Sequence, residues 1–499
     1  MQIIKEIKDK TIRLLISAYC LYFFSLRILI PHSLRNDEAE QVLAASSFEL
    51  GYLKQPPLYS WISYGLANIF NAGKLNIYLI LFVKYLSYFA FLFLIYKLAR
   101  SIFKSKKTAY LCLLSQLLFI TYSYDFTRDL SHTILVSVFS VLSLIIYLKL
   151  WTKQSTLHYI YLGLVFGLGF MSKYNFLFTA LALVIASFSH RHAFKILFNF
   201  KTLLSFFTCA LIGSPHLYYL YHKNFSGIEY ALERSNKVVE KSYSFLELVI
   251  KKFSTLALTY YEIILVVIIL SLLFIVFSKK PANMDIIKTP NYNFKKFFVN
   301  FSIIALCIPL LMVIFLGFNQ FFAKWLSPVA FLAPLVFFIY LKGPVEKLKI
   351  TVLEFIVSII IITISSVYIL GGFFPDLVGK ISQTQYPYKD LCKQIYKLKS
   401  VQFRSSHINI ITQNNEVLEA NLKLTCKEAT VNSIYKIKDS EPERFSEDSS
   451  VIVFNNKKKR EKFIQRMEKH SQVISENLVT LQAKYINSNK QFYKVYVIY

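Results

Sequence analysis

Three carboxylates gather in the stretch "RNDEAEQ", which spans residues 35–41. If this stretch is helical, Asp37 and Gln41 share one face and Glu38 lies to one side of it. A carboxylate held at a substrate site suits the work of a general base, because it can remove a proton from an attacking hydroxyl group. The alternative is a solvated loop whose acids pair with nearby cations such as Arg35. Position alone does not decide between the two.

A second acidic turn, "YDFTRD", places Asp125 and Asp129 on either side of Arg128. Asp129 directly precedes an apolar run. It is a candidate for the same site as the first acids. Alternatively it is the N-cap of the helix that follows, since aspartate is a preferred N-cap residue.

Cations recur near the ends of other apolar runs. Lys173 interrupts an apolar stretch in "MSKYN", and His216 and His222 follow Pro215 in "SPHLYYLYHKNF". Such cations can hold a phosphate group, so with the acids they suit an amphiphilic substrate with an anionic head and a lipid tail. The alternatives are a lysine that extends to the membrane interface and histidines that form ordinary hydrogen bonds rather than bind a metal.

The elements that must position these side chains are membrane helices. Of the 499 residues 55% are hydrophobic and 17% are aromatic, and the apolar residues cluster in long runs. Lys plus Arg (57) exceeds Asp plus Glu (29), which gives a net charge of +28. Many of the positive residues lie in short loops between apolar runs, which indicates membrane orientation rather than nucleic-acid binding.

We expect about eleven spans, because each run is long enough to cross a bilayer. The first run is too long for a signal peptide and is expected to remain as a membrane helix. The expected spans are 12–31, 76–98, 108–124, 130–150, 202–221, 253–277, 298–318, 321–341 and 350–371, with two short helices in 157–189 that meet at Lys173.

The basic loops fall on one side of the membrane if the N-terminus is cytoplasmic, and an odd number of spans then puts the C-terminus outside. On this topology both acidic turns and Lys173 lie outside. The first outside loop, 32–75, is expected to form two interfacial helices, because Pro56 and Pro57 end one helix and allow another to begin at Leu58. Charges lie at span ends, whereas a transporter is expected to bury them in the middle of spans.

The chain divides into a membrane domain, 1–372, and an extracytoplasmic α/β domain, 373–499. In the second, β-like runs at 408–412 and 450–454 alternate with helical segments such as 456–470.

Cysteine spacing fits no zinc motif. Cys392 and Cys426 lie in the polar C-terminal region. If that region is exported, they form either a disulfide or two free thiols.

The stretch "NDEAEQVLAASSFELGYLKQPPLYSWI" resembles the first outside loop of glycosyltransferase family 39, the group of protein O-mannosyltransferases and the aminoarabinose transferase of lipid A. Two residues differ from the family's pattern. Gln55 stands where the family usually has Lys, with Lys54 one place earlier. Lys324 stands where the family usually has Asn. Further similar stretches follow in the family's order: "TRDLSHTILVSVFSVLSLIIYL", "GLVFGLGFMSKYNFLF", "GSPHLYYLYHKNFSGIEYALER", "FAKWLSPVAFLAPLVF" and "ITQNNEVLEANLKLTC".

This resemblance implies a polytopic α-helical membrane protein of GT-C architecture, with about 11 to 13 transmembrane helices and a small extracytoplasmic α/β domain. It implies an inverting glycosyltransferase in the bacterial inner membrane, with its site facing the periplasm. The donor would be a sugar linked to a polyprenyl phosphate. The acceptor would be a glycolipid such as lipid A, a polysaccharide or a protein. The resemblance fixes no cofactor and leaves a divalent metal open, with no metal ligands assigned.

The resemblance also assigns roles by position. Asp37 would be the general base, and Glu38 and Asp129 would line the same cavity. Cations near the donor phosphate would stabilise the negative charge that grows on the leaving group. The remaining assignments are Lys173, Lys54 and His216 for the donor phosphate, and Tyr52, Gln55, Trp61, Arg128, Tyr174 and Trp325 for the acceptor and lipid cavity.

Two other functions stay open at this point. A transporter or flippase of lipid-linked sugars would share the lipid cavity but would not need a base. A non-catalytic membrane scaffold would use its exported domain to bind a partner.

We predict that a reporter that is active only in the cytoplasm stays silent when it is fused after Tyr499, because the predicted topology puts the C-terminus outside. A fusion after Arg100, in a predicted cytoplasmic loop, is the positive control. Reporter activity at Tyr499 would overturn the side to which the site is assigned.

Overall fold

The computed structural model consists mainly of α-helices together with a five-stranded β-sheet. The chain forms two compact units, which we call the helical unit and the mixed unit. The helical unit comprises Met1–Phe24, Ser47–Ile62 and Phe82–Thr363, and the mixed unit comprises Ser25–Ser46, Ser63–Leu81 and Ile364–Tyr499. The structure describes residues 8–30, 33–71, 76–103, 105–235, 245–277, 294–315, 321–340, 350–378, 383–402, 408–412, 415–433, 450–454, 473–481 and 491–498.

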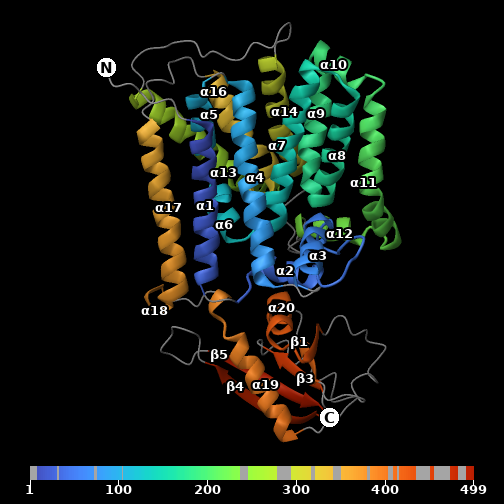
Figure 1. Ribbon diagram of the computed structural model, residues 1–499, viewed down its shortest axis with the longest axis vertical. Helices are drawn as coiled ribbons and strands as arrows, with labels where there is room; N and C mark the ends of the chain where they lie inside the picture. Colours follow the sequence, from blue (N-terminus) through green and yellow to red (C-terminus); the bar gives the residue numbers. More distant parts are fainter. Residues whose placement is uncertain are drawn as a thin grey trace. The chain divides into compact units, whose positions relative to one another are not determined.

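Among the described residues, seven helices are long and apolar enough to cross a membrane, or eight if one bent pair counts as a span. Each of the seven coincides with a predicted span. The chain is therefore a multi-pass membrane protein (Figure 1). The seven helices are α1 (Asp9–Leu29), α4 (Ile77–Ile102), α7 (Ser131–Thr152), α11 (Thr202–His222), α13 (Phe245–Phe277), α14 (Phe294–Phe315) and α17 (Ile350–Phe373).

The other predicted spans are shorter or broken. The break predicted at Lys173 is confirmed, because one helix ends at Ser172 and the next turn begins at Tyr174. The last of these spans is a helix pair bent by 51°. The elements are α5 (Lys106–Gln116), the π-helical turn η1 (Thr121–Asp125) and α6 (Phe126–Arg128); α8 (Thr156–Ser172), η2 (Tyr174–Phe176) and α9 (Leu177–Phe188); and η3 (Ala323–Leu326), α15 (Ser327–Ala330) and α16 (Leu332–Tyr340).

Close helix packing holds the helical unit together. α8 packs against both α7 and α11, and α9 packs against α14 (Figure 1). A side chain at Gly163 of α8 would come within 2.2 Å of the Ser205 carbonyl oxygen on α11, so a glycine is needed where these helices meet. Short helices complete the chain: α2 (Asn36–Ala44), α3 (Leu58–Asn71), α10 (Arg191–Leu197), α12 (Ser226–Ser235) and α18 (Pro375–Val378).

The sheet of the mixed unit has the strand order β2-β1-β3-β5-β4. β1 runs parallel to β2 and β3, and β5 runs antiparallel to β3 and β4. Helix α20 joins β1 to β2, as a parallel pair requires a crossover connection. The strands are β1 (Ile408–Thr412), β2 (Ala429–Ser433), β3 (Ser450–Phe454), β4 (Val473–Leu481) and β5 (Gln491–Ile498), and the helices beside them are α19 (Tyr388–Gln402) and α20 (Glu416–Thr425).

The predicted strands at 408–412 and 450–454 are confirmed. The helix predicted at 456–470 lies outside the described residues. The domain bounds of 1–372 and 373–499 stay a prediction. The mixed unit begins earlier, at Ile364, and also takes in the segment with the first acidic cluster, Ser25–Ser46.

Cys392 on α19 and Cys426 after α20 form a disulfide, with their Cα atoms 5.6 Å apart. Both lie in a small apolar core with Leu391, Ile410 and Leu418. Of the two alternatives that the sequence left open, the structure therefore has the disulfide. The cross-link closes a loop between α19 and α20, which restricts the unfolded chain.

We predict that the denatured, unreduced protein reacts with a maleimide polymer at four cysteines and the reduced protein at six, because Cys20, Cys112, Cys209 and Cys307 are the free thiols. The Cys392→Ser/Cys426→Ser variant should show the same four additions with and without reductant. Loss of the cross-link should destabilise the mixed unit by about 3 to 4 kcal/mol. Cys209→Ser is the matched control, and six additions before reduction would contradict the pairing.

Candidate functional site

The first acidic cluster forms helix α2, as the sequence predicts. α2 begins at Asn36, and Glu38 reaches back so that its carboxylate accepts the Arg35 backbone N–H at 3.0 Å. This contact satisfies one of the N–H groups that a helix start leaves without an intrahelical partner. Helix α3 begins at Leu58, directly after Pro56 and Pro57, which also agrees with the prediction.

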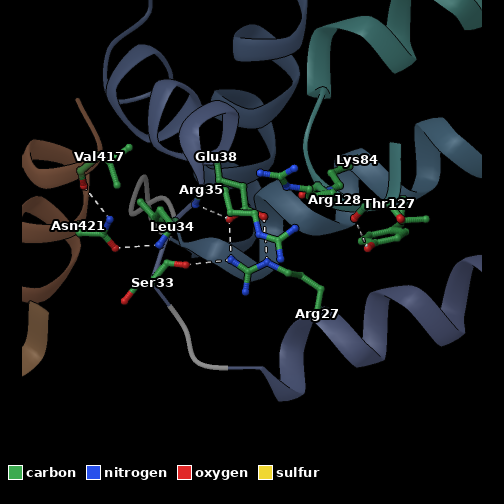
Figure 2. A network of polar contacts seen from close by, with 11 residues as sticks. Arg27, Ser33, Leu34, Arg35, Glu38, Lys84, Thr127, Arg128, Val417 and Asn421 are labelled. Atoms are coloured by element: carbon green, nitrogen blue, oxygen red, sulfur yellow. Dashed lines mark hydrogen bonds and ion pairs between the residues drawn. The ribbon is translucent and has the colours of Figure 1, made fainter. Parts of the chain in front are cut away.

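Glu38 and Arg27 form a buried ion pair. Arg27 Nε donates to one carboxylate oxygen at 3.1 Å and Arg27 Nη2 donates to the other at 2.6 Å (Figure 2). Nη2 also donates to the Ser33 carbonyl oxygen at 3.0 Å. The two side chains are 3% and 0% exposed, so this fork is shielded from water. Glu38 therefore joins the end of α1 to the start of α2.

Two further contacts fix the residues before α2. The Leu34 N–H donates to Asn421 Oδ1 on α20 at 2.9 Å, while Asn421 Nδ2 donates to the Val417 carbonyl oxygen at 2.7 Å (Figure 2). The guanidinium of Arg35 lies over the ring of Tyr368, 5.1 Å from its centroid. The backbone that leads into the acidic helix is thus held by α1, α17 and α20.

Asp37 has a different environment from Glu38. It lies in the first turn of α2 and is half-buried, whereas Glu38 is fully buried. Gln41, one turn further along the same face, is also fully buried. Both Glu38 oxygens contact Arg27, and Asp37 is the more accessible carboxylate of this pair.

Lys173 lies at the break between α8 and α9 and is half-buried. Its Nζ donates to Thr133 Oγ1 in the first turn of α7 at 2.7 Å. The neighbouring Asn175 donates from Nδ2 to the Trp325 carbonyl oxygen at 2.9 Å. The break therefore carries a cation on a turn that two other elements hold in place.

His216 is buried inside α11, and its Nε2 lies 3.0 Å from the Tyr174 hydroxyl. The two rings stack with their centroids 5.9 Å apart. Gly51 allows the first loop to approach this pair, because a Cβ there would lie 2.6 Å from His216 Nδ1 and 2.3 Å from Tyr219 Cδ1. Lys173, Tyr174 and His216 are thus brought together around one turn.

Asp129 does not occupy the N-cap position of the following helix. α7 begins at Ser131, and its N-cap is Leu130, which has a left-handed backbone with φ 57°. A leucine in this region is strained, and such strain is concentrated at functional positions. The N-cap alternative for Asp129 is therefore wrong, and Asp129 is a half-buried carboxylate beside a strained turn.

The other candidate residues make local contacts. Gln55 is half-buried. The rest engage neighbouring rings and carbonyl oxygens: Tyr52 Oη donates to Ser47 O at 2.9 Å, Trp61 Nε1 donates to Glu49 O at 2.7 Å, Lys54 lies 6.0 Å from the centroid of Tyr230, Arg128 lies 5.5 Å from that of Tyr124, and Trp325 packs edge-on against Phe321 and Phe322.

The candidate residues divide between the two compact units. Asp37 and Glu38 belong to the mixed unit, and Asp129, Lys173 and His216 belong to the helical unit. Within the described part of the chain, no group of three or more His, Cys, Asp or Glu side chains could hold a metal ion.

Several buried polar side chains that support the candidate residues were not identified from the sequence. Arg27 and Asn421 support the acidic helix, and Lys84 and Glu262 lie inside spans with 0% and 5% of their surface exposed. The expectation that charges lie only at span ends is therefore wrong at these two positions. Lys84 and Glu262 could have been identified from the sequence, because an ionisable residue within an apolar run is a candidate functional position by default.

We predict that Glu38→Leu lowers the stability of the detergent-solubilised protein by about 3 to 5 kcal/mol, because the Arg27 charge is left buried without its partner. Arg27→Met should cost a similar amount. The double variant should be more stable than the sum of the two losses predicts, since no charge is left behind. Thermal unfolding measures all three, with Glu40→Leu on the same helix as control. Equal losses for Glu38→Leu and Glu40→Leu would contradict the role of the ion pair.

Known proteins resemble this chain at the levels of sequence and fold. A family model described as dolichyl-phosphate-mannose-protein mannosyltransferase matches residues 54–219, which include Asp129, Lys173 and His216 but not Asp37. The lipopolysaccharide core galacturonosyltransferase RgtB of Rhizobium johnstonii is 27% identical over 329 residues, which are 65% of this chain and 63% of that protein. RgtA of the same organism is 31% identical over 216 residues, 42% of each chain. The chain thus matches less than two thirds of the length of either curated relative.

Two solved structures share the fold along nearly the whole chain. ArnT from Cupriavidus metallidurans bound to undecaprenyl phosphate superposes with a TM-score of 0.56 at 13% identity and covers 98% of both chains. The apo state of the same protein gives a TM-score of 0.59 at 12% identity and covers 97% of both. The predicted GT-C architecture is confirmed by this agreement in fold. The chain thus shares its fold with ArnT, and in sequence it is similar to the mannosyltransferase family model and to the two galacturonosyltransferases.

Proposed function

We propose that this chain is an inverting glycosyltransferase that moves a sugar from a polyprenyl phosphate to an acceptor hydroxyl group of the bacterial envelope. The observation that carries the proposal is the contrast within α2. Glu38 is fully engaged with Arg27, whereas Asp37 is half-buried on the same rigidly anchored turn. A general base must be held within hydrogen-bond reach of the proton that it removes, and a fixed helix supports such positioning.

The comparisons support a substrate class. ArnT of Cupriavidus metallidurans was solved with undecaprenyl phosphate, which supports a polyprenyl phosphate as the lipid carrier of the donor. Both curated relatives are named for transfer of galacturonic acid to the lipopolysaccharide core. A galacturonosyl donor and a lipopolysaccharide core acceptor are therefore the first pair to test.

Each proposed role follows from the chemistry of the step. Asp37 takes the proton of the acceptor hydroxyl as its oxygen attacks the anomeric carbon from the face opposite the phosphate. The bond between the anomeric carbon and the phosphate oxygen breaks, and the polyprenyl phosphate leaves with both bonding electrons. Lys173 balances the negative charge on that leaving group, with Lys54 and His216 as further contacts. Asp129 orients the acceptor or the base.

The orientation is part of the proposal. The basic loops favour a cytoplasmic N-terminus and place both acidic turns on the periplasmic side of the inner membrane. The disulfide between Cys392 and Cys426 supports an exported C-terminal region, because disulfides persist in oxidising compartments.

A transporter of lipid-linked sugars is the second candidate. Lys84 and Glu262 favour it, since buried charges inside spans are typical of transport pathways. A transporter would move the lipid across the bilayer without breaking the bond between sugar and phosphate, and it would not depend on Asp37.

We predict that the protein in nanodiscs transfers galacturonic acid from a synthetic polyprenyl phosphate to purified lipopolysaccharide core, and that Asp37→Asn lowers kcat by about 10²- to 10⁴-fold. Asparagine keeps the size of the side chain but cannot accept a proton at neutral pH. Glu40→Gln, on another face of α2, should keep wild-type turnover.

Transfer is measured by mass spectrometry of the acceptor, with mannosyl and aminoarabinosyl donors as parallel arms. Undiminished turnover in Asp37→Asn would refute the assigned base. Flipping of the donor in proteoliposomes without product in any arm would favour the transporter.

A further inference from the structure

The segment between α5 and α7 has an irregular backbone. Thr121–Asp125 forms a π-helical turn in which the Phe126 N–H donates to the Thr121 carbonyl oxygen. Phe126–Arg128 adds less than one α-helical turn, and Leu130 then adopts the left-handed conformation. These breaks interrupt the regular backbone ladder, so carbonyl oxygens of the segment need other donors.

Helix α4 supplies three of these donors. Lys84 Nζ donates to the Arg128 carbonyl oxygen at 3.0 Å, and the Tyr85 hydroxyl donates to the Thr127 carbonyl oxygen at 2.9 Å. One turn later, the Tyr88 hydroxyl donates to a carbonyl oxygen of the π-helical turn, that of Tyr122. Figure 2 shows Lys84 lying against Arg128 and Thr127. The C-terminal end of the segment is thus held by a buried ammonium group.

Helix α13 holds the opposite end. Glu262 Oε2 accepts the Thr121 N–H at 3.1 Å, and Oε1 accepts the Thr121 hydroxyl at 3.0 Å and the Tyr261 hydroxyl at 3.1 Å. The carboxylate therefore caps the N-terminus of the π-helical turn. The Tyr122 hydroxyl adds a contact to the Ser327 carbonyl oxygen at 2.7 Å.

Both charged side chains are nearly fully buried inside apolar spans, where a charge is costly. Each of them contacts backbone groups of the same ten-residue segment, Thr121–Leu130. Asp129 belongs to this segment, and its N–H donates to the Asp125 carbonyl oxygen at 2.8 Å. A shift of either anchored end would therefore move the Asp129 carboxylate.

We propose that Lys84 and Glu262 are a pair of positioning residues that clamp the segment Thr121–Leu130 from its two ends and so fix Asp129 for transfer. The role in transfer rests on the function proposed above, whereas the clamp itself does not. As positioning residues, neither Lys84 nor Glu262 contacts the substrate. Their charged groups form hydrogen bonds with the backbone of the segment. Lys84 and Glu262 therefore have a role other than transport.

The test combines a structural and a kinetic measurement on the full-length protein in nanodiscs. In Lys84→Met and Glu262→Gln, hydrogen–deuterium exchange of the amides between Thr121 and Leu130 should become at least about tenfold faster, because the first change removes an anchor and the second puts an NH2 donor in place of one of the two acceptor oxygens. Lys84→Arg should restore protection, since a guanidinium can still donate to the Arg128 carbonyl oxygen. The controls are Lys97→Met and Glu247→Gln, exposed residues on the same two helices.

In the transfer assay, Lys84→Met and Glu262→Gln should lower kcat at least tenfold and leave the KM for the polyprenyl phosphate donor within about twofold, since they act on the position of Asp129 rather than on donor binding. Lys84→Arg should recover most of kcat. Unchanged exchange between Thr121 and Leu130 in both variants overturns the clamp. Faster exchange with unaltered kcat overturns its role in transfer. If the wild type transfers no sugar in any arm while exchange still rises in the variants, the proposed function fails and the clamp stands.

Discussion

Backbone polar groups inside a membrane protein must find partners within the protein, and this constraint governs how the candidate site is built. A regular helix satisfies its own N–H and C=O groups, but chemistry needs side chains presented from turns and helix ends. Several irregular segments near candidate residues have backbone N–H groups that donate to polar side chains. The Leu34 N–H donates to Asn421, the Arg35 N–H to Glu38, and the Thr121 N–H to Glu262.

The same constraint gives the two neighbouring carboxylates of α2 different environments. Glu38 is 0% exposed, and both of its oxygens contact the Arg27 guanidinium. Its neighbour Asp37 is half-buried on the same turn. Adjacent carboxylates in one short motif thus have different environments because helix geometry points them in different directions. The first anchors the helix so that the second can be presented in a fixed place.

The second acidic turn follows a similar design on different elements. The strained backbone at Leu130 leaves Asp129 outside the regular start of α7. Tyrosine hydroxyls and two buried charged groups hold the preceding segment, so several of its backbone groups find partners within the protein. At the break between α8 and α9, Lys173 and Asn175 make comparable contacts with Thr133 and Trp325. This fold can therefore carry polar side chains on turns between its spans.

The sequence by itself determined the membrane class, the seven long spans, the start of α3 at Leu58 and the break at Lys173, because these follow from apolar run length and from local breakers such as proline. It also located the acidic helix and two strands of the C-terminal sheet. It did not determine the partners of Glu38, the disulfide between Cys392 and Cys426, or the left-handed turn at Leu130. These depend on residues far apart in the chain or on the packing around them. Arg27 and Lys84 lie in apolar runs of the sequence, and only the tertiary structure brings a carboxylate to one and a backbone carbonyl oxygen to the other.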